Sequence, residues 1–509
     1  MLTTLAAPAF AGTWYIEDGD ITVKAGETEG TNKVSQGANQ EVEDTDTIIK
    51  NREDTASSNT VTIDAGSDKV EVTLQDVNIK ADSGSALTSN GDVTLTLKGE
   101  NHLTGGNGDT YGGDGITSRG SLTISGGTVT ATGGNSTDSV GSGGSGIYSV
   151  SGDVTISGGS TVTANGGSGT ISGGSGIYSV SGDVTISGGT VTANGGSGKD
   201  GYGGYGISSS DVAISGGTVN ANGGDSKDGY GGNGISSSSG VAISGGTVTA
   251  NGGSGNSSGG NGIRSFDVAI SGGTVKAAGG NGKNGNGGNG IIGSGRVAIS
   301  GGTVNAAGGD GGNGKDGGYG IISNDIDLSG SLELTAKAGS PNGKALSQKG
   351  SELVLDTIKD KLGPGAKVTV TDANGKVNQV SIPRPVEPEE PVIPGESSDG
   401  GSAAPSTPAF PLPGLTVTDK DGQRISYTST QSGNTLTVCV GRLTASFRIS
   451  LAALRQLRAE GIETITFQTI LCSTTLSLDE LLAMGGEDAE VVLTHHIRSS
   501  TLTVGGKAV

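Results

Sequence analysis

Apolar and polar residues alternate along the middle of the chain, and the alternating segments recur at nearly constant intervals. In the typical segment 183–196, Val184 and Ile186 precede a Gly-Gly pair, and Val191 and Ala193 follow it. An alternation with a period of two predicts β-strands that bury one face. The Gly-Gly pair between the two strands predicts a turn with a positive-φ corner. The central isoleucines of successive segments are Ile124, Ile156, Ile186, Ile214, Ile243, Ile270 and Ile299.

A second series of isoleucines, each preceded by glycine, adds a third strand to every repeat. Its members are Ile116, Ile147, Ile177, Ile207, Ile235, Ile263, Ile291 and Ile321. Each repeat of about 29 residues therefore predicts three short strands, three turns and one Gly-rich loop. A unit of this kind cannot bury its apolar face alone, so the copies must stack coil upon coil. We predict an all-β fold, a right-handed parallel β-helix of roughly ten coils, in which like residues form ladders about 4.8 Å apart. One such ladder would consist of the side-chain amides of Asn165, Asn194, Asn222 and Asn251.

The chain around the repeats divides by composition into further segments. Residues 1–11 are mostly apolar or small and end in Ala-Phe-Ala, which predicts the remnant of an export signal peptide. Residues 12–382 are predicted to form the β-helix, with a C-terminal cap over the last open coil from Ser351 onward. Residues 383–414 are rich in Pro, Ser and Gly and predict an extended linker. Residues 415–509 contain less glycine and mix strand and helix patterns, which predicts a small α+β domain.

This C-terminal segment also holds both cysteines of the chain. Apolar residues at helical spacing predict helices at Leu451–Ala459 and Leu478–Met484. Cys439 and Cys472 each lie in or beside a strand pattern, and we expect them to be buried and unlinked. A disulfide between adjacent strands is the alternative.

Composition excludes several classes of partner. The chain carries a formal net charge of −20, which disfavours nucleic acid and anionic membrane surfaces. No stretch approaches the roughly 18 consecutive apolar residues that span a bilayer, so we expect no integral membrane segment. The 100 glycines are compatible with a repeat fold that turns every few residues. We expect a monomer.

Tyrosines gather in or beside the Gly-rich loops between the coils. Seven of the nine tyrosines lie there: Tyr111, Tyr148, Tyr178, Tyr202, Tyr205, Tyr230 and Tyr319. Since the coils are in register, the loops should emerge along one rim and place Tyr, Asp and Lys side by side, as in Lys199-Asp200-Gly-Tyr202. A row of tyrosines suits stacking against sugar rings, so binding is expected on the rim that carries Tyr202, Tyr230 and Tyr319. The alternative is that each ring only covers Gly-rich backbone.

A column of aspartates precedes the central strand of successive coils. It contains Asp92, Asp153, Asp183 and Asp211, and later coils add Asp267 and Asp325. Carboxylates about 4.8 Å apart repel one another, and Ca²⁺ would relieve this repulsion through oxygen ligands. Asp92, Asp153, Asp183 and Asp211 are therefore candidate calcium ligands. Equally, aspartate is a favourable turn residue that needs no ion.

Catalysis has little support in the sequence. The histidines are His102, His495 and His496, and the coils contain no Asp-Asp or Gly-His-Gly cluster. β-Helical lyases and hydrolases need a compact group of carboxylates with a nearby base. We therefore expect a protein that is not an enzyme.

Three segments near the N-terminal end carry a family resemblance. They are Trp14-Tyr-Ile-Glu-Asp-Gly-Asp-Ile-Thr22, Val72-Thr-Leu-Gln-Asp-Val-Asn-Ile79 and Asp92-Val-Thr-Leu-Thr-Leu-Lys-Gly-Glu-Asn-His-Leu103. With the repeats, they make the chain resemble the calcium-dependent, carbohydrate-binding β-helix proteins of anaerobic Gram-positive bacteria. The resemblance implies non-catalytic binding of plant-type or acidic polysaccharide, assisted by calcium, outside the cell or on its surface. Two alternatives stay open: a surface adhesin or stalk that presents the C-terminal domain, and a divergent β-helical polysaccharide lyase.

Overall fold

A computed structural model describes residues 11–383 and 414–508, except for short gaps at 420–422, 426, 433, 441, 443, 470–472, 485–488 and 497–499. The chain divides into two compact units, residues 1–382 and 383–509. Residues 1–10 of the predicted signal peptide, residues 384–413 of the predicted linker, and Cys472 lie outside the described residues.

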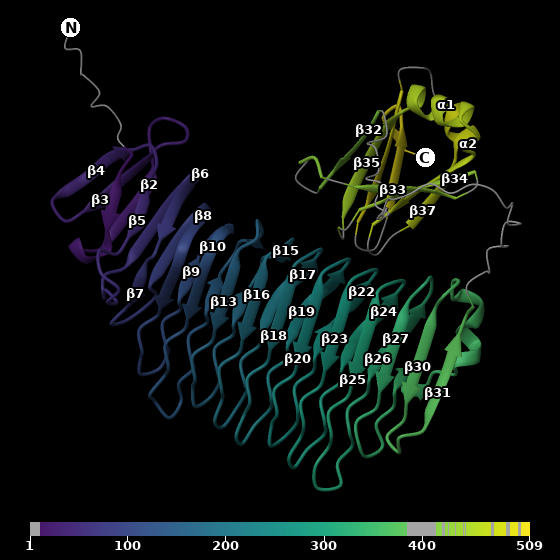
Figure 1. Ribbon diagram of the computed structural model, residues 1–509, viewed down its shortest axis with the longest axis horizontal. Helices are drawn as coiled ribbons and strands as arrows, with labels where there is room; N and C mark the ends of the chain where they lie inside the picture. Colours follow the sequence, from purple (N-terminus) through teal and green to yellow (C-terminus); the bar gives the residue numbers. More distant parts are fainter. Residues whose placement is uncertain are drawn as a thin grey trace, which may run out of the picture. The chain divides into compact units, whose positions relative to one another are not determined.

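The first unit is a β-solenoid of about 13 turns, each of roughly 29 residues (Figure 1). There are more turns than the ten or so predicted, because the irregular N-terminal strands also pair in parallel, β1 with β5 and β5 with β6. At this end β2, β3 and β4 pair antiparallel, and β2 also pairs in parallel with β6, so all three belong to the sheet of the solenoid. The N-terminal elements are β1 (Thr13–Tyr15), η1 (Ile16–Asp18), β2 (Ile21–Ala25), β3 (Asn32–Gln36), β4 (Asn39–Asp44), β5 (Ile48–Lys50), β6 (Val61–Gln75), β7 (Asn78–Lys80) and β8 (Leu87–Thr104).

The regular coils repeat a pattern of three strands, two of which merge into one longer strand in some coils. They comprise β9 (Ile116–Ser118), β10 (Leu122–Thr132), β11 (Ile147–Ser149), β12 (Val154–Ile156), β13 (Thr161–Asn165), β14 (Ile177–Ser179), β15 (Val184–Ile186), β16 (Thr190–Asn194), β17 (Ile207–Ile214), β18 (Thr218–Asn222), β19 (Ile235–Ile243), β20 (Thr247–Asn251), β21 (Ile263–Ser265), β22 (Asp267–Ile270), β23 (Thr274–Ala278), β24 (Ile291–Ile299), β25 (Thr303–Ala307), β26 (Ile321–Leu328) and β27 (Glu333–Lys337).

The predicted ladders are confirmed. Ile156 pairs with Ile124 on one side and Ile186 on the other, and Ile186 pairs with Ile214. These side chains are fully buried or nearly so, as are the valines and alanines of the third strand. The asparagine ladder is also present: Asn194, Asn222 and Asn251 each donate a side-chain N–H to the amide oxygen of the preceding coil's asparagine, at 2.9 Å.

Glycine performs two different tasks in each coil. Gly189, in the turn between two strands, has a φ of +76°, as the Gly-Gly corner predicts. The glycines of the loop are needed for another reason, because the two limbs of the loop lie in contact. Gly174 donates its N–H to the carbonyl of Gly167, and Gly196 donates to Gly174, at 2.8 and 2.7 Å. The loops are therefore hydrogen-bonded extensions of the coils, and Figure 1 shows them as parallel projections along one edge of the solenoid.

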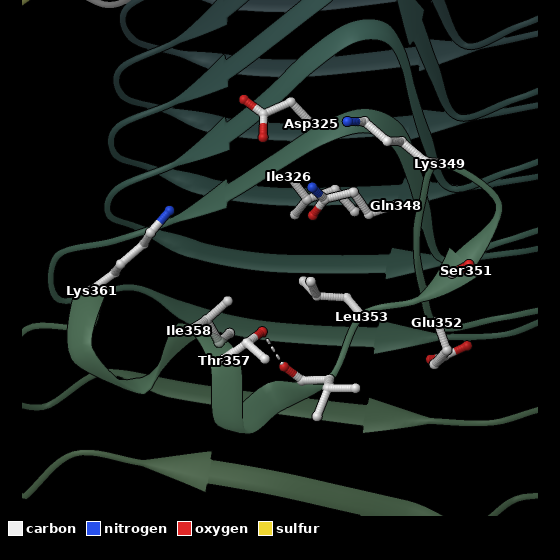
Figure 2. A pocket seen from close by; sticks show the side chains of 11 residues that line it. Asp325, Ile326, Gln348, Lys349, Ser351, Glu352, Leu353, Thr357, Ile358 and Lys361 are labelled. Carbon is white, nitrogen blue, oxygen red and sulfur yellow. Dashed lines mark hydrogen bonds between the residues drawn. The ribbon is translucent and has the colours of Figure 1, made fainter.

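Irregular elements lie at the C-terminal end of the solenoid. These are β28 (Leu346–Gln348), β29 (Ser351–Glu352), η2 (Leu355–Lys361), β30 (Lys367–Thr371) and β31 (Val377–Ser381). Strand β30 continues the parallel ladder from β27, and β31 folds back on it as an antiparallel partner. Ile358 of η2 and Ile326 of β26 are almost completely buried in the same apolar core. Figure 2 shows Leu353 and Ile358 beside Ile326 in a hollow of about 430 Å³ between η2 and β26.

The second unit is a small, mostly β domain with two short helices. Its elements are β32 (Leu415–Thr418), β33 (Thr428–Ser432), β34 (Thr435–Cys439), β35 (Ala445–Ser450), α1 (Leu451–Ala459), β36 (Thr464–Gln468), β37 (Ser473–Ser477), α2 (Leu478–Ala483), β38 (Glu490–His495), β39 (Ser500–Val504) and β40 (Lys507–Ala508). Five strands form one sheet (β32, β35, β38, β39, β40) and four form another (β33, β34, β36, β37). Phe447 and Phe467 are fully buried in its core with ring centroids 4.9 Å apart. Cys439 has a free thiol, whose pKa is raised by burial.

Candidate functional site

The loop tyrosines fall into three columns that run along the solenoid. Backbone pairing places the first column at Tyr111, Ser142, Ser172, Tyr202, Tyr230, Ser258 and Asn286 in successive coils. The second column contains Thr117, Tyr148, Tyr178 and Ser208. The third lies between the other two in each coil, at Asp114, Ser145, Ser175, Tyr205, Asn233, Asn261, Asn289 and Tyr319. The tyrosines are thus not one continuous row.

Five of the tyrosines nevertheless line a single groove of about 520 Å³: Tyr111, Tyr148, Tyr178, Tyr202 and Tyr205. The lining comes from four consecutive coils and includes glycine backbone and the nearly buried hydroxyl residues Ser145 and Ser175. Because neighbouring coils are about 4.8 Å apart, the groove extends on the order of 14 Å along the solenoid. Tyr111 and Tyr202 are 75% and 56% exposed, so their rings are available to a ligand.

Tyr202 and Tyr148 each have an aromatic neighbour in the next coil. The rings of Tyr202 and Tyr230 are stacked, with centroids 5.3 Å apart and an interplanar angle of 17°. The rings of Tyr148 and Tyr178 are tilted, at 5.6 Å and 47°. Tyr230 does not itself line the groove, and its ring stacks on Tyr202 from the next coil.

Asp114 is the one charged residue of the groove lining, and sequence reasoning did not single it out. Its carboxylate accepts hydrogen bonds from the backbone N–H of Ser145 and the hydroxyl of Thr117, both at 2.7 Å. Burial raises the pKa of Asp114, while these two hydrogen bonds oppose the shift. Burial also raises the pKa of Tyr148, and the proximity of Tyr178 and Asp114 raises it further. Asp114 thus lines the groove together with the tyrosines. Its half-buried carboxylate is held by two hydrogen bonds and can accept more.

Tyr319 lies apart from the groove, although it was expected on the same rim as Tyr202 and Tyr230. Its backbone N–H donates to the side chain of Asn289 at 2.8 Å, which places it in the third column, beyond the asparagines that follow Tyr205. Asn261 and Asn289 each donate a side-chain N–H to the asparagine of the preceding coil, at 3.0 and 2.9 Å. This second amide ladder could have been found from the Asn-Gly-Ile triplets of these coils.

The sequence predicts Tyr, Asp and Lys side by side along the rim, but the lining of the tyrosine groove contains none of the loop lysines. Lys227 and Lys283 line a separate hollow of about 410 Å³, together with Asp225. Lys199 lies 3.9 Å from Asp200, and both side chains are exposed. The groove lining contains neither lysine nor arginine.

The four candidate calcium ligands do not converge on one point. In the column of coils, Ser121 separates Asp92 from Asp153. The carboxylates of Asp153 and Asp183 each accept the backbone N–H of the next aspartate in the column, at 2.9 and 3.2 Å. Asp92 forms an ion pair with Lys69 at 3.5 Å. Among the described residues, no group of three or more His, Cys, Asp or Glu side chains could hold a metal ion. This arrangement does not fit a bound Ca²⁺.

Comparison with known proteins supports the repeat architecture. The sequence model of the beta helix repeat matches residues 122–146, 184–211, 212–239 and 241–262. Neither the curated proteins nor the solved structures compared with the chain gave a match. The matched repeats and the solenoid together show that the first unit has a β-helix fold built from repeats. No helix within the described residues has the length and apolar character needed to cross a membrane.

Proposed function

We propose that this protein is a non-catalytic, extracellular polysaccharide-binding protein, and that the tyrosine groove is its binding site. The observation that carries the proposal is that five tyrosines and one carboxylate line a single groove, whose other lining residues are mostly glycines. Aromatic rings stack on the apolar faces of sugars, and carboxylate and hydroxyl groups bind sugar hydroxyls. The glycines of the lining have no side chains, so a flat polymer can approach the backbone closely.

The composition of the groove also supports binding over bond cleavage. Glycoside hydrolysis requires a pair of carboxyl groups, and elimination requires a base beside the substrate. Asp114 is the only carboxylate that lines the groove, and no histidine, lysine or arginine lines it. The groove therefore has the groups for recognition and lacks the second carboxyl group that a glycoside hydrolase of the usual kind requires.

Affinity electrophoresis against a panel of soluble polysaccharides tests the proposal. The parent is expected to be retarded by at least one polymer, and the double variant Tyr148→Ala/Tyr178→Ala to lose most of this retardation. Tyr319→Ala is the matched control, because it removes a tyrosine that does not line the groove. Equal retardation of all three proteins would contradict the proposal, and release of product from the polymer would favour a lyase.

A further inference from the structure

The charge pattern of the groove and its surroundings restricts the class of polysaccharide that can enter. The groove lining contains Tyr, Gly and Ser residues and a single ionisable carboxyl group, that of Asp114. The chain as a whole has a formal net charge of −20. A uronate or sulfated polymer would bring further negative charge to this site with no cationic side chain in the lining to meet it.

Asp114 is held in a conformation that suits an acceptor for hydroxyl groups. The N–H of Ser145 binds Oδ1 and the hydroxyl of Thr117 binds Oδ2, so the orientation of the carboxylate is fixed from two sides. Thr117 is in turn hydrogen-bonded to the hydroxyl of Ser85 at 2.7 Å. Each carboxylate oxygen has a second acceptor site, which a sugar hydroxyl can occupy. A carboxylate in the sugar would instead repel Asp114, and more strongly than in bulk water because Asp114 is half-buried.

We infer that the groove selects uncharged, hydroxyl-rich polysaccharides and rejects acidic ones, and that Asp114 is the residue that determines this specificity. The inference rests on the proposed function and specifies its ligand. Of the plant-type or acidic polysaccharides that the family resemblance implies, it excludes the acidic ones. The four-coil length of the groove further limits the bound segment to a few sugar rings.

The test compares binding of a neutral glucan (hydroxyethyl cellulose) with binding of polygalacturonate at low ionic strength. The parent is expected to bind the neutral polymer at least tenfold more tightly. Asp114→Asn keeps the size of the side chain and removes its charge, and should reduce this ratio several-fold by improving binding of polygalacturonate. Asp200→Asn is the control, because it makes the same change in net charge outside the groove lining.

A measurement on the parent alone covers the case in which Asp114→Asn fails to fold. Raising the salt concentration screens the repulsion, so polygalacturonate binding should improve while binding of the neutral glucan stays constant. Preference of the parent for polygalacturonate, or a binding ratio that neither the variant nor salt alters, would overturn the inference. If the tyrosine variants still weaken binding in that case, the proposed function stands. A parent that bound acidic polysaccharides of the panel but no neutral one would overturn the inference and leave the proposed function standing, whereas a parent that bound no polysaccharide of the panel would contradict the proposed function as well.

Discussion

The ring of Tyr202, in the tyrosine groove, stacks on the ring of Tyr230 in the next coil of the solenoid. The ring centroids are 5.3 Å apart and the rings are nearly parallel. Tyr202 lines the groove and Tyr230 does not. The pair shows how stacking of coils brings equivalent side chains into contact, because Tyr202 and Tyr230 occupy paired positions of neighbouring coils. The contributions of the two tyrosines to binding should therefore be unequal.

Replacing Tyr202 with alanine should weaken polysaccharide binding about tenfold, because a ring that contacts sugar contributes on the order of 1 kcal/mol or more. Tyr230→Ala should cause a smaller loss, since Tyr230 acts by supporting Tyr202. Titration of each variant with the same ligand measures both effects. A loss from Tyr230→Ala that exceeds the loss from Tyr202→Ala would place the ligand on the outer rim instead.

Loop glycines are expected to be essential where the loop of one coil packs against the loop of the preceding coil. A Cβ atom at Gly232 would lie 1.9 Å from the carbonyl oxygen of Gly204, so Gly232→Ala should destabilise the solenoid by about 1–3 kcal/mol. Gly188→Ala is the control, because a Cβ there meets nothing within 4 Å. Urea denaturation measures both changes, and equal midpoints for the two variants would contradict the packing described here.

Two buried serines of the same column should respond differently to replacement. The hydroxyl of Ser118 donates to the carbonyl of Gly120 at 2.7 Å, so Ser118→Ala should cost about 1 kcal/mol. The hydroxyl of Ser89 is buried and has no hydrogen-bond partner among the described residues, so Ser89→Ala should be neutral or slightly stabilising. Measuring the free energy of unfolding of Ser118→Ala and of Ser89→Ala against the parent checks this difference. A larger cost at Ser89 would show that its hydroxyl has a role that the structure does not reveal.

The second unit should become less stable as the pH falls below about 6.5, the ordinary pKa of histidine. His495 is fully buried and near the hydroxyls of Thr474 and Thr469, at 2.9 and 3.4 Å. Burial lowers its pKa in the folded state, and His496 lowers it further. The unfolded chain then binds the proton more readily, so acid favours unfolding. Hydrogen exchange of the amides in β38 should show this loss of stability between pH 7 and 5. In His495→Gln the loss of stability over the same pH range should be smaller. The same pH dependence in both proteins would contradict a role for His495.

Removal of divalent cations should leave polysaccharide binding unchanged. The groove lining has one carboxylate; in the aspartate column, Asp153 and Asp183 accept backbone N–H groups and Asp92 pairs with Lys69. Binding measured before and after EDTA treatment checks this directly. A large loss that calcium restores would support the calcium dependence implied by the family resemblance and would require ligands outside the arrangement described here.

The coils could be predicted from the sequence because two periodicities act together. The period-two alternation around Ile186 assigns a buried face, and the repeat of about 29 residues allows only one register between coils. A shift by one residue would expose every apolar side chain. The ladder of Asn194 and Asn222 follows from the same register.

The groove could not be predicted in the same way, because it depends on the exact length of each loop. Tyr202 and Tyr205 are three residues apart yet belong to different columns, and Tyr319 aligns with Tyr205 instead of Tyr202. Asp114 occurs once and has serine at the equivalent position of the next two coils, so no repeat pattern marks it. Its place in the same groove lining as Tyr148 follows from the three-dimensional structure alone.

Calorimetric titration with an oligosaccharide of the bound polymer tests the central claim most directly, because it counts sites. A groove formed by four particular coils predicts one site per chain, which Tyr148→Ala/Tyr178→Ala removes and Tyr319→Ala preserves. Several equivalent sites per chain, or one site that the double variant leaves intact, would contradict the assignment of binding to this groove.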